Sequence, residues 1–121
     1  MENLKSVLQT NKVSYFQLRL KNTSENKIID ISKKIKKICN KYKVKFIIND
    51  NPMLAKKVSA DGCHLGQSDI NIKKARKILK NRIIGLTCHN SLKLAKKAIK
   101  NKADYIAVGG FNSSITKKIK Y

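Results

Sequence analysis

Two aspartates, Asp50 and Asp69, are the residues whose type and position point most directly to chemistry. They belong to a set of only 7 acidic residues in a chain with 28 lysines and arginines, and each follows a predicted strand. Two carboxylates and the oxygens of a bound substrate are enough to hold Mg²⁺, which keeps several of its waters. Each aspartate also precedes a predicted helix, which it could cap by accepting backbone N–H groups. The spacing alone slightly favours capping and leaves both interpretations open.

Polar residues in two other segments could bind phosphate. Gln17, Arg19 and Lys21 alternate along a predicted strand and therefore share one of its faces. They could grip a phosphate or the polar edge of an aromatic ring, or simply form the polar face of an edge strand. Near the C-terminus, Gly109 and Gly110 precede side chains that could surround a phosphate together with backbone N–H groups: Ser113, Ser114, Thr116 and Lys117. Neither segment is specific by itself.

Two Cys-His pairs, Cys63-His64 and Cys88-His89, raise the question of a zinc site. Neighbours on a strand point to opposite faces, so each pair would supply one ligand at a time. We therefore expect buried structural thiols. The 3 cysteines are an odd number without a CxxC pair, which predicts reduced thiols in the cytoplasm. His89 could act as a general base, although polar packing is the simpler expectation.

The elements that position these residues alternate between strand and helix patterns. Helical stripes of apolar residues at spacings of three and four separate short runs rich in β-branched residues. Thr23 or Ser24 could cap the longest helix, and Pro52 suits the first turn of another. The predicted strands are 13–20, 44–48, 62–65, 82–87 and 104–108; the predicted helices are 26–42, 52–59, 72–79 and 91–100, with a short one at 3–10.

The alternation predicts an α/β fold with about five parallel strands, and the polar residues indicate which kind. A doubly wound sheet would bury the polar face that carries Gln17 and Arg19. A barrel instead lets polar side chains at strand ends point into a central site. Polar clusters follow each predicted strand, as at Asn49-Asp50 and at Thr87. We therefore predict a partial TIM-type (β/α) barrel that occupies residues 1–121 as one domain.

Composition excludes several classes of protein. The formal net charge of +21 invites a nucleic-acid partner. However, all the basic residues except Arg19, Arg76 and Arg82 are lysines, whereas base and phosphate recognition favours arginine. We attribute the lysines to codon bias and consider a nucleic-acid partner unlikely. The apolar runs are too short for a membrane span, and the start lacks a secretion signal. A cytoplasmic protein is expected.

Five segments in series resemble thiamine phosphate synthase, in the superfamily that also contains the thiazole tautomerase. The resemblance runs from about Val13 to Lys117, in order and with similar spacing. The matching segments are QLRLK at 17–21, FIIND at 46–50, ADGCHLGQSD at 60–69, IGLTCHN at 84–90 and ADYIAVG at 103–109. One such segment would be weak, and five in series are specific.

The resemblance implies an eight-stranded barrel that joins hydroxymethylpyrimidine diphosphate to thiazole phosphate, releasing pyrophosphate and forming thiamine phosphate. By this resemblance Asp50 and Asp69 would hold Mg²⁺, in place of the capping role, and Thr87 would keep a hydroxyl near the substrate. The substrate-binding residues would be Gln17, Arg19 and Lys21 for the pyrimidine diphosphate, Asn49 for the pyrimidine, Ser114, Ile115 and Thr116 for the thiazole phosphate, and Lys117 for the diphosphate.

The implied chemistry needs charge stabilisation more than proton transfer. Departure of pyrophosphate leaves a pyrimidine-methyl cation, so Mg²⁺, Lys21 and Lys117 would stabilise the leaving group. The resemblance also implies one strand before Asn3 and two after Tyr121, so the chain lacks about three strands. We expect impaired catalysis, and open sheet edges that favour self-association or a complementing chain.

Two alternatives belong to other classes of function. One is proton transfer like that of the thiazole tautomerase, with His89 as the base. The other is a non-catalytic module that binds phosphate ligands or RNA. Insensitivity to Mg²⁺ removal would favour the first, and salt-sensitive RNA binding that survives mutation of Asp50 and Asp69 would favour the second.

Overall fold

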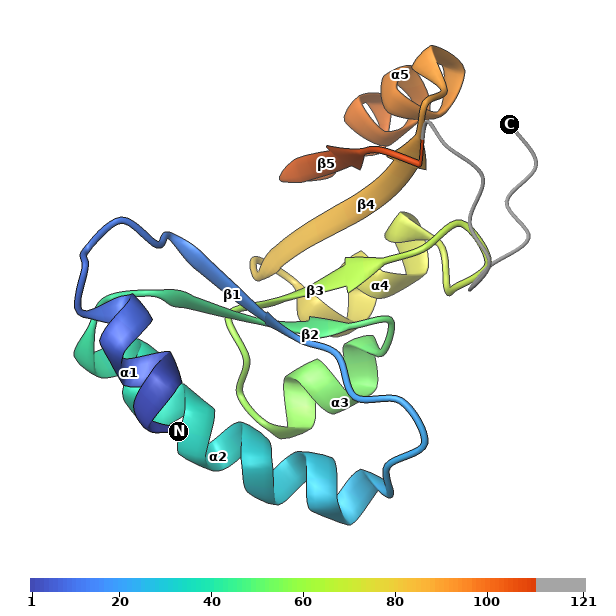
Figure 1. Cartoon of the computed structure of the whole chain (residues 1–121). Helices are drawn as coiled ribbons and strands as arrows, with labels where there is room; N and C mark the ends of the chain where they lie inside the picture. The colour runs from blue at the N-terminus through green and yellow to red at the C-terminus, as the bar shows by residue number, and fades with distance from the viewer. Residues whose placement is uncertain (111–121) are drawn as a thin grey trace.

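The structure, a computed structural model, describes residues 1–110 as one parallel sheet with helices between its strands (Figure 1). The strands occur in the order of the sequence, which confirms the predicted alternation. They are β1 Tyr15–Leu18, β2 Lys45–Asn49, β3 Gly62–Leu65, β4 Ile83–His89 and β5 Tyr105–Val108. The helices are α1 Glu2–Leu8, α2 Glu25–Lys41, α3 Pro52–Lys57, α4 Ile72–Leu79 and α5 Leu92–Lys100.

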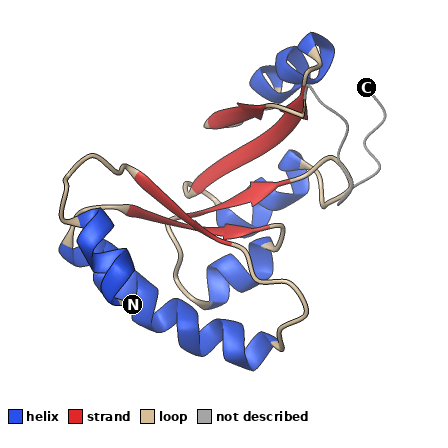
Figure 2. Cartoon of the chain, viewed as in Figure 1, coloured by secondary structure: helices blue, strands red, loops and turns tan. Residues whose placement is uncertain are grey.

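The sheet curls, and its helices gather on the outer side of the curl (Figure 2). Helices α2 to α5 contact strands β2, β3 and β4. This arrangement is the curled half of a (β/α) barrel, so the predicted fold class is confirmed. This arrangement explains the alternation of apolar and polar side chains along a strand. One face of each strand packs against helices, and the other faces the interior of the curl.

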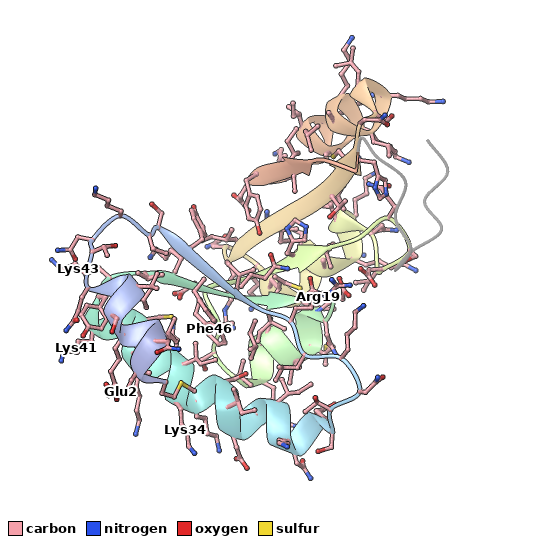
Figure 3. All side chains as sticks on the ribbon, viewed as in Figure 1. Glu2, Arg19, Lys34, Lys41, Lys43 and Phe46 are labelled. Carbon is pink, nitrogen blue, oxygen red and sulfur yellow. The ribbon has the colours of Figure 1, made fainter. Side chains whose placement is uncertain are left out.

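The core lies between the sheet and the helices. Phe46 of β2 is fully buried there and points to the helical layer (Figure 3). Each large apolar side chain buried in this way contributes about 1.5–3 kcal/mol. The 3 cysteines, Cys39, Cys63 and Cys88, are free and buried, as expected.

Exposed lysines such as Lys34 and Lys41 lie on the outer surface of α2. No helix among the described residues is long and apolar enough to span a membrane.

Strand β1 is shorter than the sequence pattern predicts. Its pairing with β2 runs from Tyr15 opposite Lys45 to Leu18 opposite Ile48. Arg19 and Lys21 therefore lie in the loop after the strand, and the prediction that they share a strand face with Gln17 is wrong. The polar alternation continues beyond Leu18, although the pairing of β1 with β2 stops there, opposite Ile48.

Two aspartates fix the amino end of the sheet, where the strands begin. Asp61 precedes β3, and its Oδ2 accepts hydrogen bonds from Phe46 N at 2.8 Å and Lys36 Nζ at 2.7 Å. Asp104 precedes β5, and its Oδ2 accepts from Ile84 N and from Arg76 Nη2, both at 2.8 Å.

The two arrangements repeat each other in more than their side chains. The Asp61 N–H donates to the Phe46 carbonyl, and the Asp104 N–H donates to the Ile84 carbonyl, both at 2.8 Å. Each aspartate thus bonds both the N–H and the carbonyl of a single residue on the preceding strand. A backbone N–H with a charged acceptor forms a strong hydrogen bond, so these aspartates hold the strands together.

Candidate functional site

An open cleft of about 670 Å³ lies at the carboxyl end of the sheet, where the strands end. Parallel strands all end at the same edge, so every strand contributes to it. The cleft is lined by Gln17, Arg19, Asn49, Asp50, His64, Gly66, Gln67, Ser68, Thr87, His89, Ala107, Val108, Gly109 and Gly110. Figure 3 shows Arg19 at this end of the molecule. Lys21 is described but is not among these residues, so the structure does not bring it into the cleft.

Asp50 occupies a strained turn directly after β2. Its φ is 64°, in the left-handed region, and the Asn51 N–H donates to the Asn49 carbonyl across it at 2.8 Å. A three-residue turn with positive φ is rare and strained, and such strain is common at binding sites. The Asp50 N–H donates to the His64 carbonyl of β3 at 2.7 Å, which anchors the turn to the sheet.

Asp69 lies in the loop after β3. Its Oδ2 accepts a hydrogen bond from the Gly66 N–H at 2.7 Å. A Cβ at Gly66 would come within 3.0 Å of the same oxygen, so glycine permits the close approach. Gly66 and Gln67 also line a neighbouring hollow of about 330 Å³ beside α4 and α5, and Asp69 lines that hollow. The carboxylate of Asp69 therefore lies against Gly66, the residue at the border between the hollow and the cleft.

Asp50 and Asp69 nevertheless lie in one region of the molecule. Burial, and then the negative charges of these two carboxylates, raise the pKa of the Cys63 thiol to about 12. Cys63 lies on β3, between the loops that carry the two aspartates. The Asp50 N–H bonds the His64 carbonyl and the Asp69 carboxylate bonds Gly66 two residues further on, so both aspartates lie at the carboxyl ends of β2 and β3.

Neither aspartate caps a helix. The cap of α3 is Asn51, whose Oδ1 accepts from Leu54 N at 3.0 Å, and the cap of α4 is Asn71, whose Oδ1 accepts from Lys74 N at 3.0 Å. The capping hypothesis for Asp50 and Asp69 is wrong, because the helices begin at Pro52 and Ile72 and the cap position falls on asparagine.

Amide side chains join the strand ends across the cleft. The Gln17 Nε2 donates to the Asn49 Oδ1 at 2.5 Å, which links β1 to β2. The Gln67 Nε2 donates to the Thr87 carbonyl at 2.6 Å, which links the β3 loop to β4. The structure thus brings Gln17, Asn49 and Thr87 together as predicted. The predicted residues Ser114, Ile115, Thr116 and Lys117, together with Ser113, lie outside the described residues.

A hydrogen-bonded group on β3, β4 and β5 was missed by the sequence analysis. His64 Nδ1 lies 2.9 Å from Tyr105 Oη, and His64 Nε2 lies 2.8 Å from Thr87 Oγ1. Burial lowers the pKa of His64, against the opposing field of Asp69. Burial raises the pKa of Tyr105 to about 12. The imidazole and the phenol are therefore both neutral at neutral pH.

One signal in the sequence could have indicated this group. Gly85 faces the Tyr105 ring, and a Cβ at Gly85 would lie 2.1 Å from that ring. A glycine in the middle of a strand marks such a close approach. Gly85 is paired with both His64 and Tyr105 in the sheet register, so the glycine makes room for the contact between them.

The side chains of Cys63 and His64 point to opposite faces, as expected for strand neighbours. Cys63 belongs to the core under the helices, and His64 faces Tyr105 and Thr87. Within residues 1–110, no three His, Cys, Asp or Glu side chains form a group that could hold a metal ion. Any ion held by Asp50 and Asp69 would need further oxygens from a ligand or from water.

Comparison with known proteins gives consistent matches along the chain. A family model described as thiamine monophosphate synthase matches residues 1–120. The thiamine-phosphate synthase of Pelagibacter ubique is 64% identical over 121 residues, which cover 99% of this chain and 58% of that protein. The thiamine-phosphate synthase of Alcanivorax borkumensis is 50% identical over 86 residues, covering 70% of this chain and 40% of that protein.

A solved structure has the same fold. The thiamine phosphate pyrophosphorylase from Pyrococcus furiosus superposes with a TM-score of 0.83 and 32% sequence identity. The match covers 90% of this chain and 53% of that chain. The present chain therefore spans between two fifths and three fifths of the length of these relatives.

Proposed function

Since the chain belongs to the thiamine monophosphate synthase family, we propose that its cleft binds hydroxymethylpyrimidine diphosphate together with Mg²⁺. The bound diphosphate would then condense with thiazole phosphate to give thiamine phosphate and pyrophosphate. The observation that carries the proposal is the position of the two aspartates at the carboxyl end of β3: the Asp50 N–H bonds the His64 carbonyl, and the Asp69 carboxylate bonds Gly66, which lines the cleft.

The two carboxylates suit Mg²⁺ by their chemistry. Neither caps a helix, and the chain has only 7 acidic residues against 28 basic ones, so two acids at one edge of the sheet are a concentrated negative site. Mg²⁺ prefers carboxylate oxygens and fills its remaining positions with water and substrate phosphates. When bound, the ion would neutralise charge on the diphosphate leaving group.

The chain's own side chains would orient the substrate. Arg19 lines the cleft and carries the fork of N–H donors that matches phosphate oxygens. The Gln17–Asn49 pair presents amide groups that suit the polar edge of a pyrimidine, and its internal hydrogen bond holds both amides in place before the ligand arrives. Departure of pyrophosphate needs no proton from these residues, so they act by position and charge.

The three free, buried thiols also support a reducing, cytoplasmic setting for the protein.

Pairing of the open edge at β1 or β5 with another copy of the chain, or with a complementing chain, stays a prediction. Sedimentation of the purified chain, with and without ligand, measures its oligomeric state and tests this prediction.

Calorimetric titration with hydroxymethylpyrimidine diphosphate, with and without Mg²⁺, tests the proposed function. We expect binding that needs Mg²⁺ and that weakens about 100-fold in Asp69→Asn, because a metal ligand loses its charge. Asp30→Asn removes the same charge from an exposed position on α2 and is the matched control. Equal affinity with and without Mg²⁺, or in Asp69→Asn and wild type, would contradict the proposal. Thiamine phosphate formation after addition of thiazole phosphate tests the condensation.

A further inference from the structure

Three hydrogen-bonded groups form a continuous line from the interior of the curl to the cleft. Tyr105 Oη lies 2.9 Å from His64 Nδ1, and His64 Nε2 lies 2.8 Å from Thr87 Oγ1. Thr87 lines the cleft, whereas the Tyr105 ring packs over Gly85 and 5.8 Å from the Tyr15 ring. His64 is only 7% exposed, so neither of its nitrogens has ready access to bulk water.

A neutral imidazole has one N–H donor and one acceptor nitrogen, so the two hydroxyls must play opposite roles. Either Tyr105 donates to Nδ1 and Nε2–H donates to Thr87, or every bond runs in the reverse direction. A phenol is a far stronger acid than an aliphatic alcohol, which makes Tyr105 the better donor and Thr87 the better acceptor. In both arrangements the bonds run in one direction and strengthen one another, so the acidity of the phenol decides between them.

We infer that Tyr105 is a positioning residue that fixes His64 as the Nε2–H tautomer, so that the Thr87 hydroxyl must donate its own proton into the cleft. The line of donation runs from Tyr105 through His64 to Thr87 and ends on an acceptor atom of the bound substrate. No proton is transferred, and only the direction of three hydrogen bonds is set.

The inference deepens the proposed function and rests on it for the identity of the ligand. Hydroxymethylpyrimidine diphosphate offers only acceptors at its diphosphate oxygens, so a Thr87 hydroxyl held as a donor suits it. A Thr87 hydroxyl that donated to His64 would instead present lone pairs to those oxygens. The tautomer of His64 therefore decides between attraction and repulsion at this point of the cleft.

Long-range ¹H–¹⁵N NMR of the uniformly ¹⁵N-labelled chain reports the tautomer without any ligand. The chain has 2 histidines, and His89→Gln assigns their signals. We expect His64 to be protonated at Nε2 in the wild type and to shift at least partly to the Nδ1–H form in Tyr105→Phe. Tyr15→Phe removes the hydroxyl of the neighbouring ring and should leave the tautomer unchanged. An Nδ1–H tautomer in the wild type, or an unchanged tautomer in Tyr105→Phe, would overturn the inference.

Calorimetry with hydroxymethylpyrimidine diphosphate and Mg²⁺ adds the functional readout. We expect about a 3–10-fold loss of affinity in Tyr105→Phe, the usual effect of one hydrogen bond, and no loss in Tyr15→Phe. A changed tautomer with unchanged affinity would refute the role of Thr87 as the donor. If the wild type binds no diphosphate, the proposed function fails, and the tautomer still decides the positioning role of Tyr105. Should Tyr105→Phe not fold, an Nδ1–H tautomer in the wild type would still overturn the inference.

Discussion

Both ends of the sheet carry two aspartates, and the two pairs have opposite surroundings. At the amino end, the Oδ2 atoms of Asp61 and Asp104 each accept one backbone N–H from a neighbouring strand and one cationic side chain, at 2.7–2.8 Å. At the carboxyl end, Asp50 stands on a turn with a φ of 64°, and Asp69 accepts an N–H from its own loop. The fields of Asp50 and Asp69 converge on one buried thiol.

The difference shows how one residue type serves stability at one end and binding at the other. A carboxylate that closes the hydrogen bonds of two strands contributes to the folded state itself. A strained turn costs stability, and such strain is common where the turn serves a binding site. This division matches the barrel architecture, in which sites form at the carboxyl ends of strands and the amino ends hold the scaffold.

The largest effect expected from this comparison is at Asp50. Asp50→Gly keeps the left-handed turn without a Cβ and removes the carboxylate. We expect Mg²⁺-dependent affinity for hydroxymethylpyrimidine diphosphate to fall about 100-fold, because one of two metal ligands is lost. The free energy of unfolding should change by no more than about 1 kcal/mol, because glycine accepts positive φ without strain and so offsets the loss of the side chain. Calorimetry and urea unfolding measure the two quantities, and a loss of stability with intact affinity would reverse the roles assigned to the two ends.

Asp61→Ala is the opposite experiment at the amino end. We expect the free energy of unfolding to fall by about 2–3 kcal/mol, because the Phe46 N–H and the Lys36 ammonium lose their acceptor. Diphosphate affinity of the folded protein should not change. Thiol labelling provides a second measure, since burial raises the pKa of Cys39 to about 11 and keeps it unreactive in the folded state. Labelling of Cys39 should accelerate in Asp61→Ala and not in Asp50→Gly.

A smaller effect is expected in the pH dependence of the free energy of unfolding, which should differ between the two ends of the sheet. Burial lowers the pKa of His64, so between its ordinary value of 6.5 and its folded value the unfolded chain binds the extra proton. Stability is therefore lost as pH falls from about 6.5, and His64→Gln should abolish that loss.

The amino end should respond only in stronger acid. Although burial opposes ionisation, the Lys36 ammonium and the Phe46 N–H lower the pKa of Asp61 below its ordinary value of 3.8. Its contribution to stability is present above that value and is lost as pH falls toward the folded pKa. Urea unfolding across pH 3–7 in wild type, His64→Gln and Asp61→Asn measures both steps. If Asp61→Asn removed the loss of stability near pH 6, the assignment of that loss to His64 would be contradicted.

Much of the fold follows from local sequence signals. The strand at Gly62–Leu65 and the helix at Ile72–Leu79 have the predicted bounds, since turn residues limit the first and an apolar stripe with a preceding asparagine defines the second. The β1 prediction was too long because alternation reports which face is polar and not where pairing stops. Pairing depends on contact with the neighbouring strand, and it stops at Leu18, opposite Ile48.

The site was predictable where it depends on topology and not where it depends on side-chain contacts. Gln17, Asn49, Asp50 and Thr87 meet because parallel strands end at one edge. Asn51 caps α3 and Asp50 does not, because the helix begins at Pro52. Sequence propensities do not place a helix boundary to within one residue. The contact between His64 and Tyr105 depends on the space above Gly85, a property of three strands packed together.

Paramagnetic broadening by Mn²⁺, which favours the same oxygen ligands as Mg²⁺, tests the central claim most directly. In the presence of hydroxymethylpyrimidine diphosphate, we predict selective broadening of the backbone amide signals of Asp50, His64 and Gly66. The amide signals of Phe46, Asp61 and Ile84 at the amino end are further away and should broaden less at the same, substoichiometric Mn²⁺ concentration. Broadening centred on the amino end, or spread evenly over the surface, would contradict the division of labour between the two ends of the sheet.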